Sequence, residues 1–590
     1  MSTWAKRLNN QCFRRNSSYL CPSIINEILR KNEYIYEPKN VGPVKRIFVN
    51  QLAANNPCED RSAATFFRRK PSSLASLYQT GEINEEIADE GYRTSMEKSN
   101  FLFSVIDGHA GYYCADYVVQ QIHEYIAYAL TNLNYNDEQF DFHRILPEQS
   151  NNNQFSFNTK PSDSWREYCQ RNANIDSQSL LKKCFEHLDC NLINDANLAV
   201  TKLLESAGPS FSLLKKLQGT SKTREDLEQI LAKNKPFIQA ASSGACCCTV
   251  MINDNKLTVA SAGDCFAVLG KVVKSKSSSS KLSANGNYET VETLNLTVPH
   301  NYWNTIERSR ILSAHPNEDF ALSSERLLAC LLPFRAFGDL NFKLPLSLLN
   351  SKYRQLLGSS FILPNYISPP YLTSSPDTMC VELSHDTDRF ILIASDGLSD
   401  MISGQAAASV IHQFLSIERA LEPCRLVDHQ NNPLKWSVLS KELDLRANAL
   451  SKHHLIAASA QSFTNARDWQ EENRTKPLSK NHNIYQRLNM DSSILTKSSE
   501  QYRQNILDEL IDRNAATYLI RHALSGGYQN GVDYSMLEYL LSHSNPRMVR
   551  DDITVIIIQL NVDYLSTCSN NRINNNSDMD HISVPNHSNS

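Results

Sequence analysis

The chain has 590 residues, and its 59 basic and 63 acidic side chains leave a formal net charge of -4. This length is enough for a large hydrophobic core, and the near-neutral charge excludes a general electrostatic attraction to nucleic acid or to anionic membranes. No apolar run reaches the length of about 18 residues that a membrane-spanning helix needs, so we expect no membrane insertion.

The amino-terminal segment is basic and has no acidic residue before Glu27. Its basic residues are Lys6, Arg7, Arg14 and Arg15. Together with several Ser and Asn residues and the absence of a long apolar stretch, this composition is typical of a mitochondrial transit peptide. We expect residues 1–40 to be a transit peptide and a disordered start, and the mature protein to lie in the mitochondrial matrix. The alternative is a disordered start of a cytoplasmic protein.

The cysteine content indicates buried thiols. There are 15 cysteines, an odd number, and no spacing among them matches a zinc site. Three are adjacent in an apolar segment, Cys246, Cys247 and Cys248, which favours thiols in a strand over disulfides. A reducing compartment, either the cytosol or the mitochondrial matrix, fits this usage.

Two strongly patterned segments open the ordered part of the chain. The apolar run Phe101–Asp107 predicts a short buried strand that ends in an acid. Apolar residues at three- and four-residue steps from Ala115 to Leu130 predict a helix with one apolar face. Ser177–Glu205 and Thr223–Lys233 are also expected to be helical.

Strands dominate the following region. Ala245–Ile252 and Lys256–Ala262 are two apolar runs separated by the turn residues 253–255, which predicts a β-hairpin. Further elements are expected as strands at Phe266–Val273, Asp388–Ser395 and Ile553–Leu560 and as a helix at Asn514–Leu524. Strands and helices do not alternate strictly along the chain, and neighbouring strands are joined by hairpins. This pattern predicts an α+β fold.

Polar, irregular stretches interrupt these elements. We expect one domain over residues 41–561, with insertions near residues 134–175, 274–290 and 440–503. Residues 562–590 are rich in Asn and Ser and contain few large apolar side chains, which predicts a disordered tail.

Acidic motifs follow or precede several of the predicted strands. They are Glu59-Asp60, Asp107-Gly108-His109, Asp396-Gly397 and Asp551-Asp552. Carboxylates gathered at one rim of a sheet repel one another unless protons or cations compensate. Mg²⁺ and Mn²⁺ prefer oxygen ligands, so such a cluster is a candidate metal site. Each motif alone is also typical of an ordinary turn, and spacing leaves open whether the four converge.

In this order, the motifs resemble those of the type-2C metal-dependent protein phosphatases. The resemblance is carried by Glu59-Asp60-Arg61, Phe103–Gly111, Ser243-Gly244-Ala245 with Ala262-Gly263-Asp264, Arg335–Asp339, Ser395–Leu398 and Arg550–Val555. Other segments resemble one branch of the family, the pyruvate dehydrogenase phosphatase catalytic subunits. These are Asn50–Asp60, Arg326–Lys343, Pro364–Leu372 and Asn514–His522.

The resemblance implies a fold and an activity. The fold would be αββα, with two antiparallel β-sheets packed as a sandwich and flanked by helices. The activity would be that of a protein serine/threonine phosphatase with two Mg²⁺ or Mn²⁺ ions per site, to which some members add a weaker third. The alternatives are a general cytoplasmic type-2C phosphatase and a pseudophosphatase that acts as a binding module.

The branch implies a substrate and partners. The substrate would be phosphoserine of the pyruvate dehydrogenase α-subunit, whose dephosphorylation reactivates the complex. The lipoyl-bearing core of the complex and a regulatory subunit would be further partners, and no nucleic-acid partner is expected.

Carried over residue by residue, the resemblance assigns a metal site. Asp107 would be the carboxylate that bridges two metals, and the Gly108 carbonyl would bind one of them. The other implied ligands are Asp60, Asp396 and Asp551 directly, Glu59 through water, and Asp264 and Asp400 for the weaker third ion. The metals would lower the pKa of a shared water so that hydroxide attacks phosphorus. His109 would be the general acid that protonates the departing serine oxygen, and a structural histidine is the alternative.

Two features depart from the family pattern. Many relatives have a phosphate-binding Arg at the position of Asn55, and the pyruvate dehydrogenase branch resembles this chain in having Asn there. The residue that binds phosphate is therefore unassigned. Ser399 replaces an aromatic residue, and Cys265-Phe266 replaces Ser-Arg, which concerns packing or the surroundings of the third metal more than the main ligands.

Overall fold

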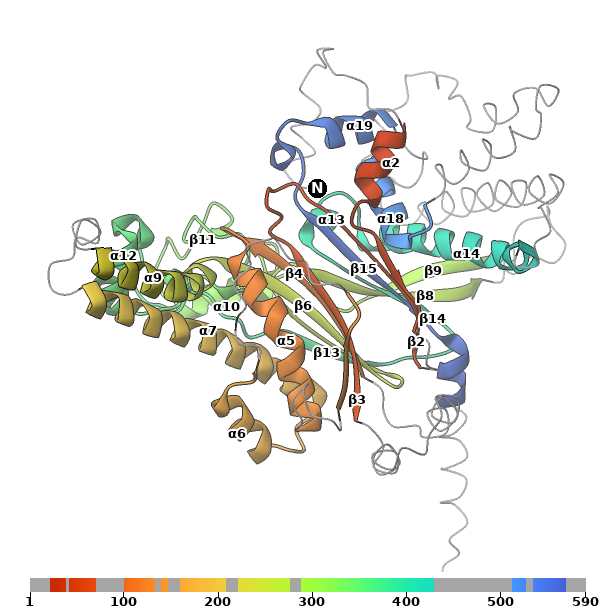
Figure 1. Ribbon diagram of the computed structural model, residues 1–590. Coiled ribbons are helices and arrows are strands. Elements are labelled where there is room, and N and C mark those ends of the chain that lie inside the picture. Colours follow the sequence, from red (N-terminus) through yellow and green to blue (C-terminus); the bar gives the residue numbers. More distant parts are fainter. Residues whose placement is uncertain are drawn as a thin grey trace, which may run out of the picture. The chain divides into compact units, whose positions relative to one another are not determined.

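The computed structural model of the protein describes residues 22–38, 42–69, 100–132, 140–146, 157, 160–207, 221–275, 288–428, 512–526 and 534–568 (Figure 1). The described residues cluster into two compact units. One unit lies within residues 1–33, 273–292 and 401–544, and the other lies within residues 34–272, 293–400 and 545–590.

The first of two large sheets has six strands. In spatial order they are β1 (Tyr34–Tyr36), β2 (Val44–Leu52), β15 (Ile553–Leu560), β14 (Asp388–Ala394), β8 (Phe266–Ser275) and β9 (Tyr288–Asn295). The pairings of β2 with β15, of β15 with β14 and of β14 with β8 are antiparallel. The carboxy-terminal strand β15 therefore lies in the interior of the sheet.

The second large sheet has seven strands. The path runs through β13 (Asp377–Glu382), β7 (Lys256–Ala262), β6 (Gly244–Asn253), β4 (Asn100–His109), β3 (Arg61–Arg69) and β5 (Phe140–Arg144), and β12 (Phe337–Gly338) also pairs with β6. All these pairings are antiparallel. Strands β6 and β7 form the predicted hairpin, in which Asn253 pairs with Lys256 and Asp254 has the positive φ of 52° that suits a tight turn.

The two sheets share a core of buried apolar side chains. It joins Val49 of β2 and Ile556 of β15 to Phe103 of β4 and Val250 of β6. Successive residues of β4 alternate between this core and a second one on the opposite face of the strand, because side chains of a strand point to alternate sides. The predicted α+β fold with two packed antiparallel sheets is thus confirmed.

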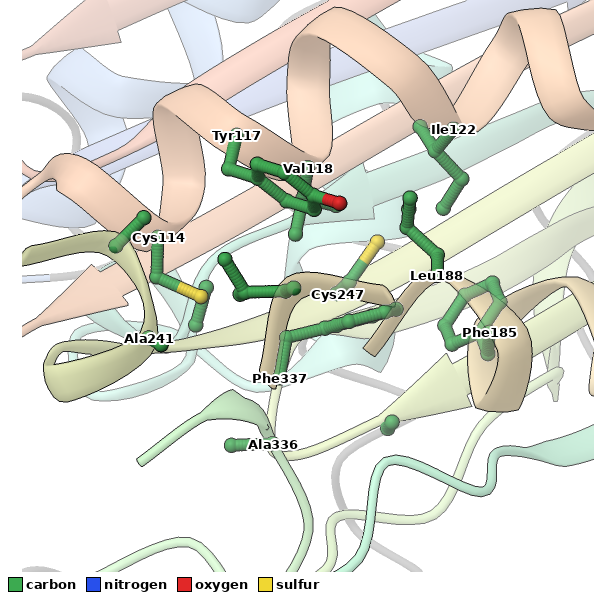
Figure 2. Close-up of a cluster of buried hydrophobic side chains, with 14 of the residues drawn as sticks. Cys114, Tyr117, Val118, Ile122, Phe185, Leu188, Ala241, Cys247, Ala336 and Phe337 are labelled. Carbon is green, nitrogen blue, oxygen red and sulfur yellow. The ribbon is translucent and has the colours of Figure 1, made fainter. Parts of the chain in front are cut away.

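Helices cover the other face of the seven-stranded sheet. They are α5 (Tyr113–Thr131), α7 (Ser177–Ala207) and α9 (Ser221–Ser242), and α6 (Asp163–Arg171) packs against α5 (Figure 1). Figure 2 shows Val118 and Ile122 of α5 and Phe185 of α7 gathered around Cys247 of β6 and Phe337. This packing explains the apolar face that the sequence predicts for residues 115–130.

Short elements connect the sheets of this unit. They are α10 (Thr305–Ala314), the hairpin of β10 (Leu322–Ser323) and β11 (Arg326–Leu327), η1 (Leu340–Phe342), α11 (Leu346–Leu348), the π-turn η2 (Leu349–Tyr353), α12 (Arg354–Leu357), η3 (Ser359–Phe361), α13 (Asp396–Ser399) and η5 (Pro546–Met548).

The other unit contains the described helices α2 (Pro22–Arg30), α14 (Gly404–Asp428), α18 (Ala515–Leu524) and α19 (Tyr534–Ser542), together with the end of β8 and most of β9. The buried Asp512 carboxylate links α18 to α2, since it accepts two hydrogen bonds of 2.7 Å from Arg521 and lies 3.3 Å from Arg30. Asn514 caps the start of α18, because its side chain accepts from two backbone N–H groups of the first turn.

Several boundaries differ from the predicted ones. The predicted insertion at 134–175 contains β5 and α6, in which Trp165 is buried, and the one at 274–290 begins and ends in strands. Residues 562–568, expected in the disordered tail, form a helix with Leu565 buried. Residues 1–21, 440–503 and 569–590 lie outside the described residues.

Two simpler predictions can also be compared with the structure. Cys246, Cys247 and Cys248 are buried free thiols in β6, as predicted. Of the helices in the described part of the chain, none combines the length and the apolar character needed to cross a membrane.

Candidate metal centre

Strand register brings acids from distant motifs to one end of the seven-stranded sheet. Arg61 at the start of β3 pairs with Ile106 of β4, so the preceding Asp60 lies beside Asp107. Asp264 follows the end of β7. Because neighbouring strands are antiparallel, the start of β3 and the ends of β4 and β7 all lie at this end.

The six-stranded sheet supplies the remaining acids. Asp396 follows β14 and begins the short helix α13, and Asp551 and Asp552 directly precede β15. Ala394 at the end of β14 pairs with Val555 near the start of β15, so these acids also lie at one end of their sheet.

Three of the predicted ligands form a close group across the two sheets. One carboxylate oxygen each of Asp107, Asp264 and Asp396 lies within 4.8 Å of the other two. Asp60 is 1% exposed, and its Oδ2 atom is buried without a hydrogen-bond partner among the described residues. Burying such an atom without a partner is unfavourable.

The crowding of these acids raises their pKa values. Burial, reinforced by the neighbouring Asp552, raises the pKa of Asp60 to about 7, and burial together with Asp264 raises that of Asp396 to about 6. The pKa of Asp107 also lies well above its ordinary value, because it is buried beside Asp396 and Asp60. Oxygen-only ligands, mutual repulsion and an unpaired buried oxygen together fit a hard divalent cation.

Asp264, the third member of the close group, and the neighbouring Asp400 also have raised pKa values. Loss of hydration raises the pKa of Asp264, and the Cys246 side chain and His109 oppose that rise. Loss of hydration and the charge of Asp396 raise the pKa of Asp400 to about 6. Of the two acids that resemble ligands of a weaker third metal, Asp264 thus belongs to the close group and Asp400 interacts with its member Asp396.

Glu59 and Asp551 make other contacts. The Glu59 carboxylate accepts from the Gly111 N–H at 2.7 Å. The Asp551 carboxylate forms an ion pair with Arg547 and accepts from the Asp552 N–H at 2.7 Å. Neither belongs to the close group of three carboxylates, so their roles as ligands stay predictions.

The structure assigns Asp552 a role that the sequence did not reveal. Its carboxylate accepts from the backbone N–H groups of Ala54 at 2.5 Å, Asn55 at 2.8 Å and Glu59 at 2.8 Å. It therefore holds the loop that leads to Asp60. Nearby, a Cβ on Gly108 would lie 2.5 Å from the Glu59 carbonyl oxygen, so this position requires glycine.

His109 makes a second contact that the sequence did not predict. Its Nε2 atom lies 2.6 Å from Oδ2 of Asp339, which is part of the Arg335–Asp339 motif. Burial opposes protonation of the imidazole, but the adjacent Asp339 carboxylate outweighs this effect and leaves the pKa of His109 raised. The Arg335–Asp339 motif marked this segment as part of the family pattern. Nothing in the motif indicated that Asp339 contacts His109, which lies 230 positions away.

Two of the departures from the family pattern, Asn55 and Cys265, have structural explanations. The Asn55 side chain donates to Asp552 at 3.0 Å and to Glu59 at 3.3 Å, so it supports the acidic loop. Arg61 is buried and forms an ion pair with Asp116 at 2.5 Å. Its guanidinium is therefore engaged by Asp116 and does not replace the phosphate-binding Arg of the family. Cys265 is buried in the core between the sheets.

Comparisons with known proteins point in one direction. The model of the family described as Protein phosphatase 2C matches residues 166–429. The mitochondrial protein of Rattus norvegicus named [Pyruvate dehydrogenase [acetyl-transferring]]-phosphatase 1 is 27% identical over 564 residues, which are 92% of this chain and 83% of the relative. The human mitochondrial phosphatase 2 of that name is 27% identical over 561 residues, covering 92% and 84%.

A solved structure is also similar. The serine-threonine phosphatase 2C of Toxoplasma gondii matches with a TM-score of 0.33 and 13% identity, covering 90% of this chain and 99% of the other.

Proposed function

We propose that the chain is a protein serine/threonine phosphatase of the protein phosphatase 2C kind and that it dephosphorylates phosphoserine of the pyruvate dehydrogenase α-subunit. This reaction would reactivate the pyruvate dehydrogenase complex. The proposed substrate rests on one observation, the similarity over 92% of the chain to phosphatases that are named for pyruvate dehydrogenase.

The site would hold Mg²⁺ or Mn²⁺. The close carboxylates of Asp107, Asp264 and Asp396 and the unpaired oxygen of Asp60 support this part of the proposal. The implied set also includes the Gly108 carbonyl, Glu59, Asp551 and Asp400. When bound, a pair of divalent cations lowers the pKa of water and offsets negative charge on phosphoryl oxygens.

The side chains of the protein perform the remaining chemistry. The carboxylates on the two sheets would hold the cations in fixed positions, because they extend from strands that share one core, and the phosphoryl group would be positioned through those cations. His109 would donate a proton to the serine oxygen as the bond between phosphorus and oxygen breaks, so that the product leaves as an alcohol.

The location and partners are part of the same proposal. The basic, acid-free amino terminus and the mitochondrial relatives support import into the matrix. There, residues 41–561 would act as one catalytic domain, and the lipoyl-bearing core of the complex and a regulatory subunit would be its partners. A fluorescent fusion of residues 1–40 should accumulate in mitochondria, and a diffuse cytoplasmic signal would contradict the location.

The substrate is tested by phosphate release. Phosphorylated pyruvate dehydrogenase α-subunit and phosphorylated casein are compared at equal phosphoserine concentration, each with Mg²⁺ and with a chelator. We expect kcat/KM to favour the α-subunit by about 10-fold or more, and the chelator to abolish both rates. Equal rates with the two substrates would instead indicate a general phosphatase.

A further inference from the structure

The contact between His109 and Asp339 joins two distant strands of one sheet. His109 ends β4, and Asp339 directly follows β12. The side chain of Asp339 is 5% exposed and that of His109 is 24% exposed. The carboxylate is therefore almost enclosed, and the imidazole keeps one side open.

Both residues are held through the intervening strand β6. Gly244 of β6 pairs with His109 on one side and with Gly338 on the other. A Cβ on Gly244 would collide with both the Asp339 carboxylate and the His109 ring. Glycine at this position therefore lets the two side chains meet directly over the strand.

The backbone around Asp339 is anchored independently of His109. The Asp339 N–H donates to the Ser243 carbonyl at 2.9 Å. The buried Asp189 of α7 accepts from the Gly338 N–H at 2.8 Å and from Lys343 Nζ at 2.7 Å. Asp339 itself has a φ of 48°, a strained conformation for a residue other than glycine.

This geometry distinguishes the two ring nitrogens of His109. The Nε2 atom is hydrogen-bonded to the Asp339 carboxylate. No hydrogen bond joins the Nδ1 atom to any residue in the described parts of the chain. A carboxylate that accepts the N–H of one imidazole nitrogen fixes the orientation and the tautomer of the ring.

We propose that Asp339 is a positioning residue, which holds the Nε2–H group of His109 so that the ring delivers a proton from Nδ1 to the departing serine oxygen. The Nδ1–H bond breaks as the oxygen gains its proton, and the neutral ring keeps its Nε2–H on Asp339. The inference rests on the proposed role of His109 as general acid.

The test compares leaving groups in three variants. A phosphoserine peptide needs a proton on its leaving oxygen, whereas p-nitrophenolate leaves readily without one. Asp339→Asn should lower kcat for the peptide by about 10²-fold and that for p-nitrophenyl phosphate by much less. Asp189→Asn is the matched control, because it loosens the same loop without contacting His109, and it should slow both substrates by similar factors. His109→Ala tests the underlying role.

The outcomes separate the two ideas. If His109→Ala slows both substrates equally, the general-acid role fails. If His109→Ala is selective but Asp339→Asn slows both substrates equally, only the positioning inference fails. A second measurement uses the wild-type protein alone: ¹⁵N NMR at saturating Mg²⁺ should show His109 protonated at Nε2, the atom that lies 2.6 Å from Asp339. A neutral ring protonated only at Nδ1 would overturn the proposal.

Discussion

The carboxylate of Asp552 accepts a hydrogen bond of 2.8 Å from the backbone N–H of Glu59, although 493 positions separate the two residues. This contact belongs to a set in which one carboxylate binds several donors of residues 54–59. The loop that carries two predicted metal ligands is thereby attached to the start of β15.

Replacing Asp552 should therefore loosen the acidic loop. We expect Asp552→Ala to lower the free energy of unfolding by roughly 2–3 kcal/mol, because buried N–H donors lose a charged acceptor while repulsion of Asp60 is relieved. Urea unfolding of the metal-free protein measures this change. Asp552→Asn keeps one acceptor oxygen, so its free energy of unfolding should fall by about half as much as that of Asp552→Ala. Equal stability of Asp552→Ala and the wild type would contradict this role.

Asp107 should be needed for activity and not for folding. Asp107→Asn is expected to abolish Mg²⁺-dependent phosphate release, because an amide replaces the central carboxylate of the close group. The melting temperature of the metal-free variant should be equal to or above that of the wild type, because a repelled buried charge is removed. Asp163→Asn, at an exposed position on α6, is the control. Full activity of Asp107→Asn at saturating Mg²⁺ would exclude the bridging role.

The acid cluster should make the stability of the metal-free protein depend on pH. The pKa values of Asp60 and Asp396 in the folded state, about 7 and about 6, lie above the ordinary value of 3.8. The folded state thus binds more protons than the unfolded state between about pH 4 and 7, and this stabilising contribution is lost as the pH rises through 6 and 7.

Thermal unfolding at pH 5.5 and pH 7.5 tests this dependence. In the presence of a chelator, the melting temperature should be lower at pH 7.5 than at pH 5.5, because the stabilising protons of the cluster have been lost. Added Mg²⁺ should raise the melting temperature more at pH 7.5 than at pH 5.5. Asp396→Asn should flatten the pH dependence. If the wild type and Asp396→Asn show the same dependence, the cluster does not hold these protons.

Arg547 should compete with metal binding. Its guanidinium pairs with Asp551 and lowers the pKa values of Asp396 and Asp400 against the effect of burial. Arg547→Gln removes this positive charge and should tighten Mg²⁺ binding about 5-fold at low salt, with a smaller effect at high salt. Isothermal titration calorimetry measures the affinity, and Arg547→Lys, which keeps the charge, is the control. Weaker Mg²⁺ binding by Arg547→Gln would refute the prediction.

Local patterns were sufficient to predict the elements that carry the site. The strand at Phe101–Asp107 and the helix at residues 115–130 correspond to β4 and α5, because burial on one face or both faces imposes a period on the sequence. The hairpin of β6 and β7 follows from its turn residues. The positions of Asp107 and Asp396 at the ends of strands could likewise be predicted.

The meeting of these strands could not be derived from local patterns. It depends on the order of strands within each sheet, which joins β2 to β15 and β3 to β4 across long segments of chain. The resemblance to a known family supplied that information. The contact of Asp339 with His109 and the role of Asp552 remained hidden, because each is a hydrogen bond between residues hundreds of positions apart.

The place of β15 between β2 and β14 has a consequence for biosynthesis. A ribosome releases residues 551–560 only after every other acid of the site has been made. Until then β15 is missing between β2 and β14. Asp552 is also missing, so it cannot yet accept hydrogen bonds from the loop before Asp60. Chains whose synthesis has not yet reached residue 560 should therefore be inactive.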